Sequence, residues 1–360
     1  MRVLLINGPN LNLLGKRAPE IYGGHTLAEL EEKVVAWGAE LGAQVETLQS
    51  NDESELISAV QTSGHDAILL NPAAFTHTSR GLAEAIASVE TPTVEVHISN
   101  IREREPWRAH SMIADSCVRT IYGRGVAGYR DGLRHLVNRA AAPVEAVRYG
   151  PHSENVGDLR LGGRGLVVLV HGGFWRHERE RDSMEPLAVD LGRRGFNTWN
   201  IEYRRLERGG GWPGAFHDTL MALDFVPQLG LDSGSVGVVG HQAGAVLAMW
   251  AARRTGAEVG RVAAMAPVTD LRKHAESGLT GAREACRLLG SGAPARPDPG
   301  RAPTMLVHGT RDRHVPPEHS EALASERGLQ LLSPETDHFE LLDPRGDHWE
   351  DVAAALGDPA

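Results

Sequence analysis

The sequence predicts an α/β protein with two domains, the first built on a parallel, doubly wound sheet. Short apolar runs alternate with segments of helical periodicity from the first residues onward, the pattern of βαβ units. The chain has 360 residues, which is long for one domain. A second series of buried-strand patterns begins after an alanine-rich stretch near residue 143. We therefore expect domains at residues 1–142 and 147–360, joined by a linker at residues 143–146.

Composition indicates an ordinary globular protein. Hydrophobic residues make up 41% and charged residues 23% of the chain, which is enough for two cores. The net charge is -10 and acidic residues outnumber basic ones in both halves, so the sequence favours neither a nucleic-acid partner nor an anionic membrane. Only two cysteines occur, Cys117 and Cys286, which fits a reducing compartment. The first apolar run is too short for a signal-peptide core, and we expect a cytoplasmic protein.

Five strands and four helices are expected in the first half. Thr26 followed by Glu29 has the spacing of a capping box, and apolar residues from Leu27 onward follow a helical face. A continuous apolar run at residues 67–70 is typical of a strand buried on both faces. The predicted strands are residues 2–6, 43–48, 67–70, 93–96 and 119–121, and the helices lie near residues 27–41, 53–63, 80–88 and 126–139.

The loop at residues 7–24 is long for a connection between a strand and a helix. It contains four glycines and two prolines, and helical periodicity resumes only near Leu27. Loops of this length inside compact domains are usually functional or disordered. The loop is therefore either part of a site or a lid whose polar residues are incidental.

Polar side chains follow three of the predicted strands at their carboxyl ends, where ligands bind in a parallel sheet. They are Asn10, Arg17 and Tyr22 after the first strand, Asn71 and His77 after the third, and His97, Ser99, Arg104 and Arg108 after the fourth. No G-x-G-x-x-G pattern follows the first strand, which argues against a dinucleotide site.

This set suits an anionic, oxygen-rich substrate. Arginines and amides can bind carboxylate and hydroxyl groups, and an acid/base pair is available. A tyrosine is a poor base unless nearby cations lower its pKa, and the three arginines of this set, Arg17, Arg104 and Arg108, could do so for Tyr22. Each residue also has a plainer interpretation, because His97 could be a structural histidine and Asn10 a turn-former.

The first half closely resembles the type II 3-dehydroquinate dehydratases, lyases with a flavodoxin-like fold. Several long motifs carry the resemblance in the right order: residues 7–17, the pair Tyr22 and Gly23, residues 71–79 and residues 95–100. The resemblance covers residues 1 to about 142. It implies dehydration of 3-dehydroquinate in the shikimate pathway, without metal, cofactor or Schiff base.

The resemblance also implies roles for individual residues. Tyr22 would remove the C2 proton, with Arg17 favouring the phenolate; Asn10 would hold a water on the enolate; and His97 would protonate the leaving hydroxyl. It further implies that Asn71 and the backbone amides of Ile98 and Ser99 bind the substrate carboxylate, and that His77 and Arg108 bind ring hydroxyls. Glu84 would act across a subunit contact.

Two positions depart from the family pattern. Ala18 stands where an acidic residue is usual, and Glu84 stands where an aspartate is expected. The family forms trimers that assemble into dodecamers, so a homo-oligomer is implied.

The second half carries the motifs of a hydrolase. A predicted strand at residues 166–170 leads into His171, Gly172 and Gly173, an oxyanion-loop pattern, and a strand, sharp turn and helix at residues 235–253 form the context of a nucleophile elbow. Asp312 and His338 follow in the order usual for α/β-hydrolases. Residues 147–350 resemble esterases of this fold, nearest the kynurenine-formamidase-like group.

The elbow position is Gln242 rather than serine. A carboxamide has no proton that His338 could usefully remove, and its nitrogen is a very weak nucleophile. Three interpretations stay open for this half: an inactive structural or oligomerisation module, a binding module for a small acid or ester, and a hydrolase with unusual chemistry.

For the whole chain, the leading hypothesis is a dehydratase with a degenerate hydrolase domain appended. The enzymatic alternative is a bifunctional lyase and esterase or amidase. A flavodoxin-like binding protein without activity would require a decayed site around Tyr22.

Overall fold

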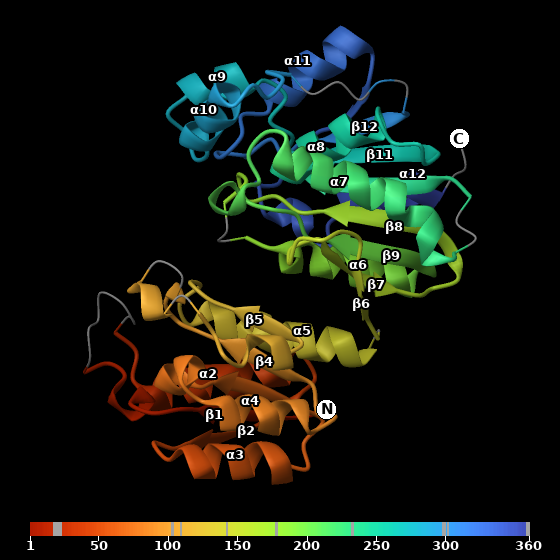
Figure 1. Cartoon of the computed structure of the whole chain (residues 1–360). Helices are drawn as coiled ribbons and strands as arrows, with labels where there is room; N and C mark the ends of the chain where they lie inside the picture. The colour runs from red at the N-terminus through yellow and green to blue at the C-terminus, as the bar shows by residue number, and fades with distance from the viewer. Residues whose placement is uncertain are drawn as a thin grey trace. The chain divides into compact units, whose positions relative to one another are not determined.

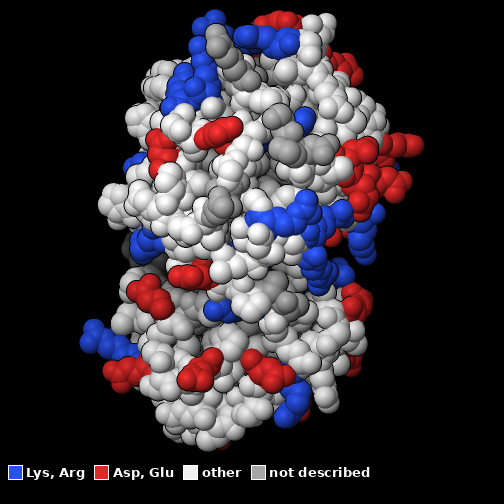
Figure 2. Space-filling model, turned by 90° about the vertical axis from the view of Figure 1, so that its right-hand side faces the viewer, with Lys and Arg blue, Asp and Glu red and all other residues white. Residues whose placement is uncertain are grey.

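The computed structural model describes residues 1–16, 24–101, 104–108, 110–141, 143–176, 179–231, 234–296, 300 and 302–357. The chain divides into two units, Met1–Ala141 and Ala142–Ala360. Each unit has a sheet of its own with helices on both faces (Figure 1). Figure 2 shows Lys and Arg intermingled with Asp and Glu across the face drawn, in a chain with 37 basic and 47 acidic residues.

The first unit is a five-stranded parallel sheet in the order β2-β1-β3-β4-β5, which confirms the predicted fold. Its strands are β1 (Arg2–Asn7), β2 (Gln44–Gln49), β3 (Ala67–Asn71), β4 (Thr93–Val96) and β5 (Arg119–Ile121), and its helices are α2 (Leu27–Glu40), α3 (Glu53–Thr62), α4 (Arg80–Ala87) and α5 (Ala127–Ala141).

Alternation along β1 explains how the helices distribute over the two faces. Val3 and Leu5 pack in one core with α2 and α5, whereas Leu4 and Ile6 pack in the other with α3 and α4. Successive side chains of a strand point to opposite faces, so one short strand serves both cores. The predicted capping box at Thr26 and Glu29 is present and fixes the start of α2.

The second unit has an eight-stranded sheet in the order β13-β12-β11-β10-β8-β9-β7-β6, in which β7 pairs antiparallel with both β6 and β9 and the other pairs are parallel. Its strands are β6 (Glu145–Arg148), β7 (Val156–Arg160), β8 (Arg164–Val170), β9 (Phe196–Ile201), β10 (Val236–His241), β11 (Val259–Met265), β12 (Thr304–Val307) and β13 (Gln330–Leu332). Its helices are α6 (Glu185–Arg193), α7 (Gly214–Phe225), α8 (Ala243–Ala252), α9 (Leu271–Glu276), α10 (Ala282–Gly290), α11 (Glu318–Arg327) and α12 (Asp347–Gly357). Glu145 and Ala146, placed in the linker by the sequence pattern, belong to β6.

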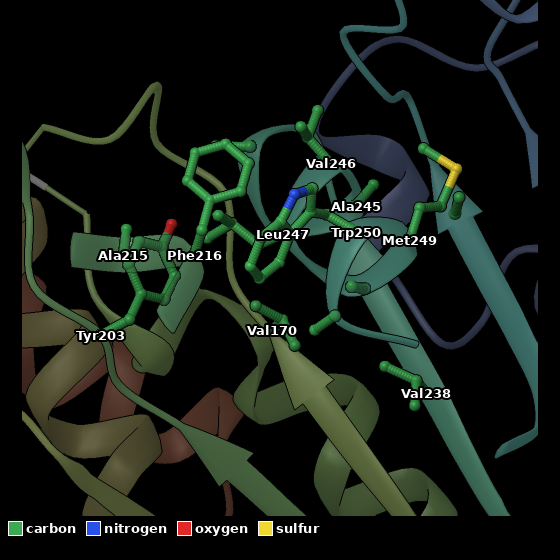
Figure 3. Packing of buried hydrophobic residues seen from close by; sticks show 14 of the residues in the cluster. Val170, Tyr203, Ala215, Phe216, Val238, Ala245, Val246, Leu247, Met249 and Trp250 are labelled. Carbon is green, nitrogen blue, oxygen red and sulfur yellow. The ribbon is translucent and has the colours of Figure 1, made fainter. Parts of the chain in front are cut away.

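Helix α8, which follows the turn after β10, is buried over almost its whole length. Every residue from Ala243 to Ala251 is buried, and Trp250 packs edge-on against Phe216 of α7 with ring centroids 5.4 Å apart (Figure 3). Such aromatic pairs contribute about 0.5–1.5 kcal/mol beyond the area they bury.

Candidate active site

A cavity of about 100 Å³ lies at the carboxyl ends of β1, β3 and β4. The predicted residues that line it are Asn10, Asn71, His77, His97, Ile98, Ser99, Arg104 and Arg108. They come from segments far apart in the sequence, which the parallel strand order brings to one edge. Arg17, Ala18 and Tyr22 lie outside the described residues.

His97 is held at this cavity by a buried carboxylate. Its Nε2 lies 2.8 Å from Oε1 of Glu95, which is fully buried. An ionised carboxylate only accepts hydrogen bonds, so Nε2 is the protonated nitrogen of this pair. The carboxylate therefore fixes the tautomer and orientation of the ring, and Nδ1 is left for chemistry in the cavity.

Two hydroxyl groups complete the surroundings of Glu95. Ser111 Oγ donates to Oε1 at 2.8 Å and Thr120 Oγ1 donates to Oε2 at 2.9 Å. Burial raises the pKa of Glu95, but the hydrogen bonds from His97, Ser111 and Thr120 outweigh it and hold the pKa below its usual value. Glu95 is thus an anion that can balance a positive charge on His97.

Asn71 is oriented by a second buried network. Its Nδ2 donates to the Tyr129 hydroxyl at 2.7 Å, and that hydroxyl lies 3.3 Å from Oδ1 of Asn7. The Oδ1 of Asn71 accepts a hydrogen bond from the backbone N–H of Ala73 at 3.2 Å. Burial raises the pKa of Tyr129, so this tyrosine stays a neutral phenol. The second Nδ2 hydrogen of Asn71 is then available to an acceptor in the cavity.

His77 can accept a hydrogen bond from a ligand. Its Nδ1 lies 2.7 Å from the carbonyl oxygen of His110 and therefore donates to it. Burial, together with the charges of His97 and Arg108, lowers the pKa of His77. A neutral ring that donates from Nδ1 leaves Nε2 as an acceptor, which suits a hydroxyl group.

Backbone conformation shapes the walls of the cavity. Asn10 has a left-handed conformation, with φ of 66°, which asparagine tolerates better than most residues. The carbonyls of Ile98 and Ser99 accept hydrogen bonds from Gly125 and Gly123, at 3.0 and 3.1 Å. These bonds hold the turn after β4 whose amides are predicted to bind a carboxylate.

Positive charge at the cavity comes from the segment around Arg108. Arg108 lies over the ring of Trp107, 4.1 Å from its centroid, and its Nε is 3.0 Å from a carboxylate oxygen of Glu105. Arg104 pairs more loosely with the same carboxylate, at 3.7 Å. Glu84, by contrast, is exposed on α4 and is not among the residues that line the cavity.

The second unit contains the predicted strand–turn–helix elbow. Gln242 joins β10 to α8 with φ of 51° and ψ of -106°, and it is fully buried. The close packing of the turn requires glycine on both sides, because a Cβ on Gly240 would lie 2.5 Å from the carbonyl oxygen of Gly244, and one on Gly244 would lie 2.0 Å from that of Val170. A residue other than glycine in this conformation is strained.

The side chain of Gln242 points at the turn after β8. Its Oε1 accepts hydrogen bonds from the backbone N–H groups of Gly173, at 2.9 Å, and Phe174, at 2.7 Å. Its Nε2 is buried and has no partner among the described residues. Two backbone donors establish that the oxygen, not the nitrogen, faces the turn.

An imidazole and a carboxylate complete this second cluster. His338 Nδ1 lies 2.6 Å from Oδ2 of Asp312, and the His338 ring is 4.7 Å from that of His241 and 6.2 Å from that of Phe174. Burial lowers the pKa of His338 even though Asp312 opposes it. Burial raises the pKa of Asp312, but the hydrogen bonds from His308 and His338 have a larger effect and hold this pKa far below its usual range.

Within the part of the chain that the structure describes, no group of three or more histidine, cysteine, aspartate or glutamate side chains is placed to hold a metal ion. No helix in these residues combines the length and apolar character needed to cross a membrane.

Comparison with known proteins separates the two units. The class II dehydroquinase family model matches residues 1–137. The 3-dehydroquinate dehydratase of Shewanella loihica is 48% identical over 145 residues, which are 40% of this chain and 97% of that protein. The catabolic 3-dehydroquinase of Aspergillus oryzae is 47% identical over 136 residues, 37% of this chain and 89% of that protein.

The chain belongs to the class II dehydroquinase family. Its dehydroquinase unit spans nearly the whole length of the first of these relatives, so the remaining residues are an addition to a full-length family member. The family model BD-FAE matches residues 162–277 of this addition. Esterase B from Lactobacillus rhamnosis, in a phosphonate-inhibited structure, is similar with a TM-score of 0.50 and 18% identity, covering 59% of this chain and 82% of that one. At this identity the likeness shows the fold alone, an α/β-hydrolase-like one.

Sequence reasoning missed two groups in the dehydroquinase unit. Glu95 was recognised only as part of a motif, although a carboxylate inside the strand pattern Thr-Val-Glu-Val is itself a signal of a buried, partnered charge. Tyr129 lies in the predicted closing helix, and nothing in the helix pattern indicates that its hydroxyl reaches Asn71.

Proposed function

We propose that this chain dehydrates 3-dehydroquinate to 3-dehydroshikimate, a step of aromatic amino acid biosynthesis through the shikimate pathway. The main support is the His97–Glu95 pair at the wall of the cavity, in a unit that aligns with 97% of a relative named for this activity.

The substrate, an anionic ring, is bound by hydrogen-bond donors that line the cavity. The free Nδ2 hydrogen of Asn71 and the amides of Ile98 and Ser99 bind the substrate carboxylate, and Arg108 adds positive charge. His77 accepts from a ring hydroxyl through Nε2. Charge-assisted bonds of this kind are about twice as strong as neutral ones, so the carboxylate positions the ring.

The chemistry is a stepwise anti elimination. Tyr22, its phenolate favoured by Arg17, removes the C2 proton, and a water held by Asn10 stabilises the resulting enolate. His97 then donates a proton to the C1 hydroxyl, which leaves as water as the double bond forms. Glu95 positions His97 and balances its charge while the ring is protonated.

The test is a direct assay on the full-length chain. Purified protein incubated with 3-dehydroquinate should produce the ultraviolet absorbance of the conjugated product, and Tyr22→Phe should reduce that rate by at least about 10²-fold because it removes the base. Absence of product from a folded wild-type sample would overturn the proposed function. Full activity in Tyr22→Phe would overturn only the assignment of the base.

Assembly and location belong to the same proposal. We infer a cytoplasmic homo-oligomer, a dodecamer by family resemblance, in which the exposed Glu84 reaches the site of a neighbouring subunit. The first domain is proposed to end at residue 142, and the second to begin no later than Glu145, where β6 starts. Sedimentation velocity of the full-length chain measures the assembly, and a monomer would contradict it.

A further inference from the structure

The α/β-hydrolase-like unit contains most of an acyl-transfer site, and this inference is independent of the dehydration proposed for the other unit. Two backbone N–H groups converge at Gly173 and Phe174, and His338 is hydrogen-bonded to Asp312 beside the elbow. Serine hydrolases need these parts: donors for a developing oxyanion, and an imidazole oriented by a carboxylate. At the tip of the elbow, where a nucleophile would stand, is Gln242.

Gln242 does more than replace a nucleophile. Its carboxamide oxygen is a carbonyl oxygen, the same type of acceptor as the carbonyl of an ester. The donor distances of 2.9 and 2.7 Å lie in the range expected for donors to a bound oxyanion. While this oxygen remains there, the carbonyl of a second molecule cannot use the same two N–H groups.

The strain at this position shows that the arrangement is imposed by its surroundings. Gln242 keeps a φ of 51° between two glycines that leave no room for a Cβ, and its Nε2 is buried without a partner among the described residues. An unpartnered buried donor costs about 1–3 kcal/mol, which the two bonds to Oε1 must offset. The side chain is therefore anchored through its oxygen.

We propose that the carboxamide oxygen of Gln242 is a built-in ligand of the oxyanion donors at Gly173 and Phe174, and that it closes a site for small carboxylic esters that is otherwise assembled. The wild-type unit then lacks hydrolase activity for two reasons: it has no nucleophile, and its oxyanion donors are occupied. Replacing the one side chain removes both obstacles.

In Gln242→Ser the reaction balances with groups already present. The serine oxygen bonds to the acyl carbon, its proton passes to His338, and the carbonyl oxygen occupies the donors that Gln242 has vacated. His338 returns the proton to the alcohol as the ester C–O bond breaks. Water then adds to the acyl carbon in the same way, the serine regains its proton, and the carboxylic acid is released.

The first experiment tests the internal ligand without requiring activity. Hydrogen exchange at the amides of Gly173 and Phe174, followed by mass spectrometry, is compared in wild type, Gln242→Met and the exposed Gln228→Ser. Methionine is similar in length but has no carbonyl, so losing bonds worth about 1.4 kcal/mol should accelerate exchange about 10-fold. Gln228→Ser should exchange like wild type. Unchanged exchange in Gln242→Met would overturn the internal ligand.

The second experiment tests the assembled site. Hydrolysis of p-nitrophenyl acetate by Gln242→Ser should exceed that of wild type by at least about 10²-fold, the contribution of one oxyanion donor in a known hydrolase. A fluorophosphonate should label this variant at residue 242, and Gln242→Ser combined with His338→Ala should return to the wild-type rate.

Each outcome decides part of the proposal. Labelling of the wild type, or ester hydrolysis by it that depends on His338, would overturn the closed site. If Gln242→Ser shows fast exchange and a native near-ultraviolet circular dichroism spectrum but no hydrolysis, the site is not assembled. If Gln242→Ser fails to fold, exchange in Gln242→Met still decides whether the donors are occupied.

Discussion

Both units contain a histidine that is hydrogen-bonded to a buried carboxylate, but the groups around this pair differ. In the dehydroquinase unit, His97 is hydrogen-bonded to Glu95 at 2.8 Å; in the hydrolase-like unit, His338 is hydrogen-bonded to Asp312 at 2.6 Å. Both carboxylates are buried, and both have pKa values held below normal by their hydrogen bonds. The histidine–carboxylate pair alone therefore does not distinguish the two sites.

The difference lies in what the remaining polar groups contact. Around His97, the side chains of Asn71 and His77 each retain one hydrogen-bonding position toward a cavity of about 100 Å³. Beside His338, the converging backbone donors are already satisfied by Gln242. A site that can bind a ligand needs groups that are oriented by the fold yet still unsaturated, and Asn71 and His77 of the first unit are in this state.

The largest change in activity is expected when Glu95, the carboxylate hydrogen-bonded to His97, is replaced. Glu95→Gln replaces the anion with a neutral amide that has no charge to balance a protonated ring. We expect kcat for dehydration to fall by about 10²-fold, since general acid catalysis typically contributes 10²–10⁴-fold. The exposed Glu90→Gln in the same unit is the matched control. An unchanged kcat in Glu95→Gln would show that the pair is structural.

A smaller effect is expected from the group that orients Asn71. Tyr129→Phe removes the acceptor of the Asn71 Nδ2 bond, and the amide is then free to turn away from the substrate carboxylate. The net loss of one hydrogen bond predicts a rise in KM of about 3–10-fold, with a smaller change in kcat. Steady-state kinetics measures both parameters. Tyr149→Phe, which removes a buried hydroxyl from the other unit, should leave KM unchanged; equal effects of the two variants would rule out a specific role for Tyr129.

Local sequence patterns were sufficient for the parts of the fold that depend on neighbours in the chain. Thr26 and Glu29 predicted the start of α2, and the apolar run at residues 67–70 predicted a central strand. Strand β6 escaped prediction because its residues, Glu145–Arg148, are mostly exposed and do not alternate. An edge strand of this kind is recognised only through its pairing with β7.

The sequence predicts which residues form the site better than it predicts the contacts between them. Motif positions at strand ends identified His97, Asn71 and His77, because a parallel sheet gathers those ends. The bond from Asn71 to Tyr129 spans 58 residues, and the bonds from Gly173 and Phe174 to Gln242 span 69 and 68. Such contacts depend on side-chain orientation after packing, which no local pattern encodes.

The smallest effect concerns stability in the second unit. The pKa of Asp312 in the folded protein lies far below its unfolded value of about 3.9, so its interactions stabilise the fold above pH 4 and are lost as the pH falls toward the folded pKa. Asp312→Asn should therefore lower the free energy of unfolding at pH 7 by about 1–3 kcal/mol, and by less at each step below pH 4. Urea unfolding at a series of pH values measures this difference, with the exposed Asp351→Asn as control. A difference that stayed constant through acid pH would mean that Asp312 contributes through packing rather than charge, and its pair with His338 would then differ from the pair of His97 with the Glu95 carboxylate.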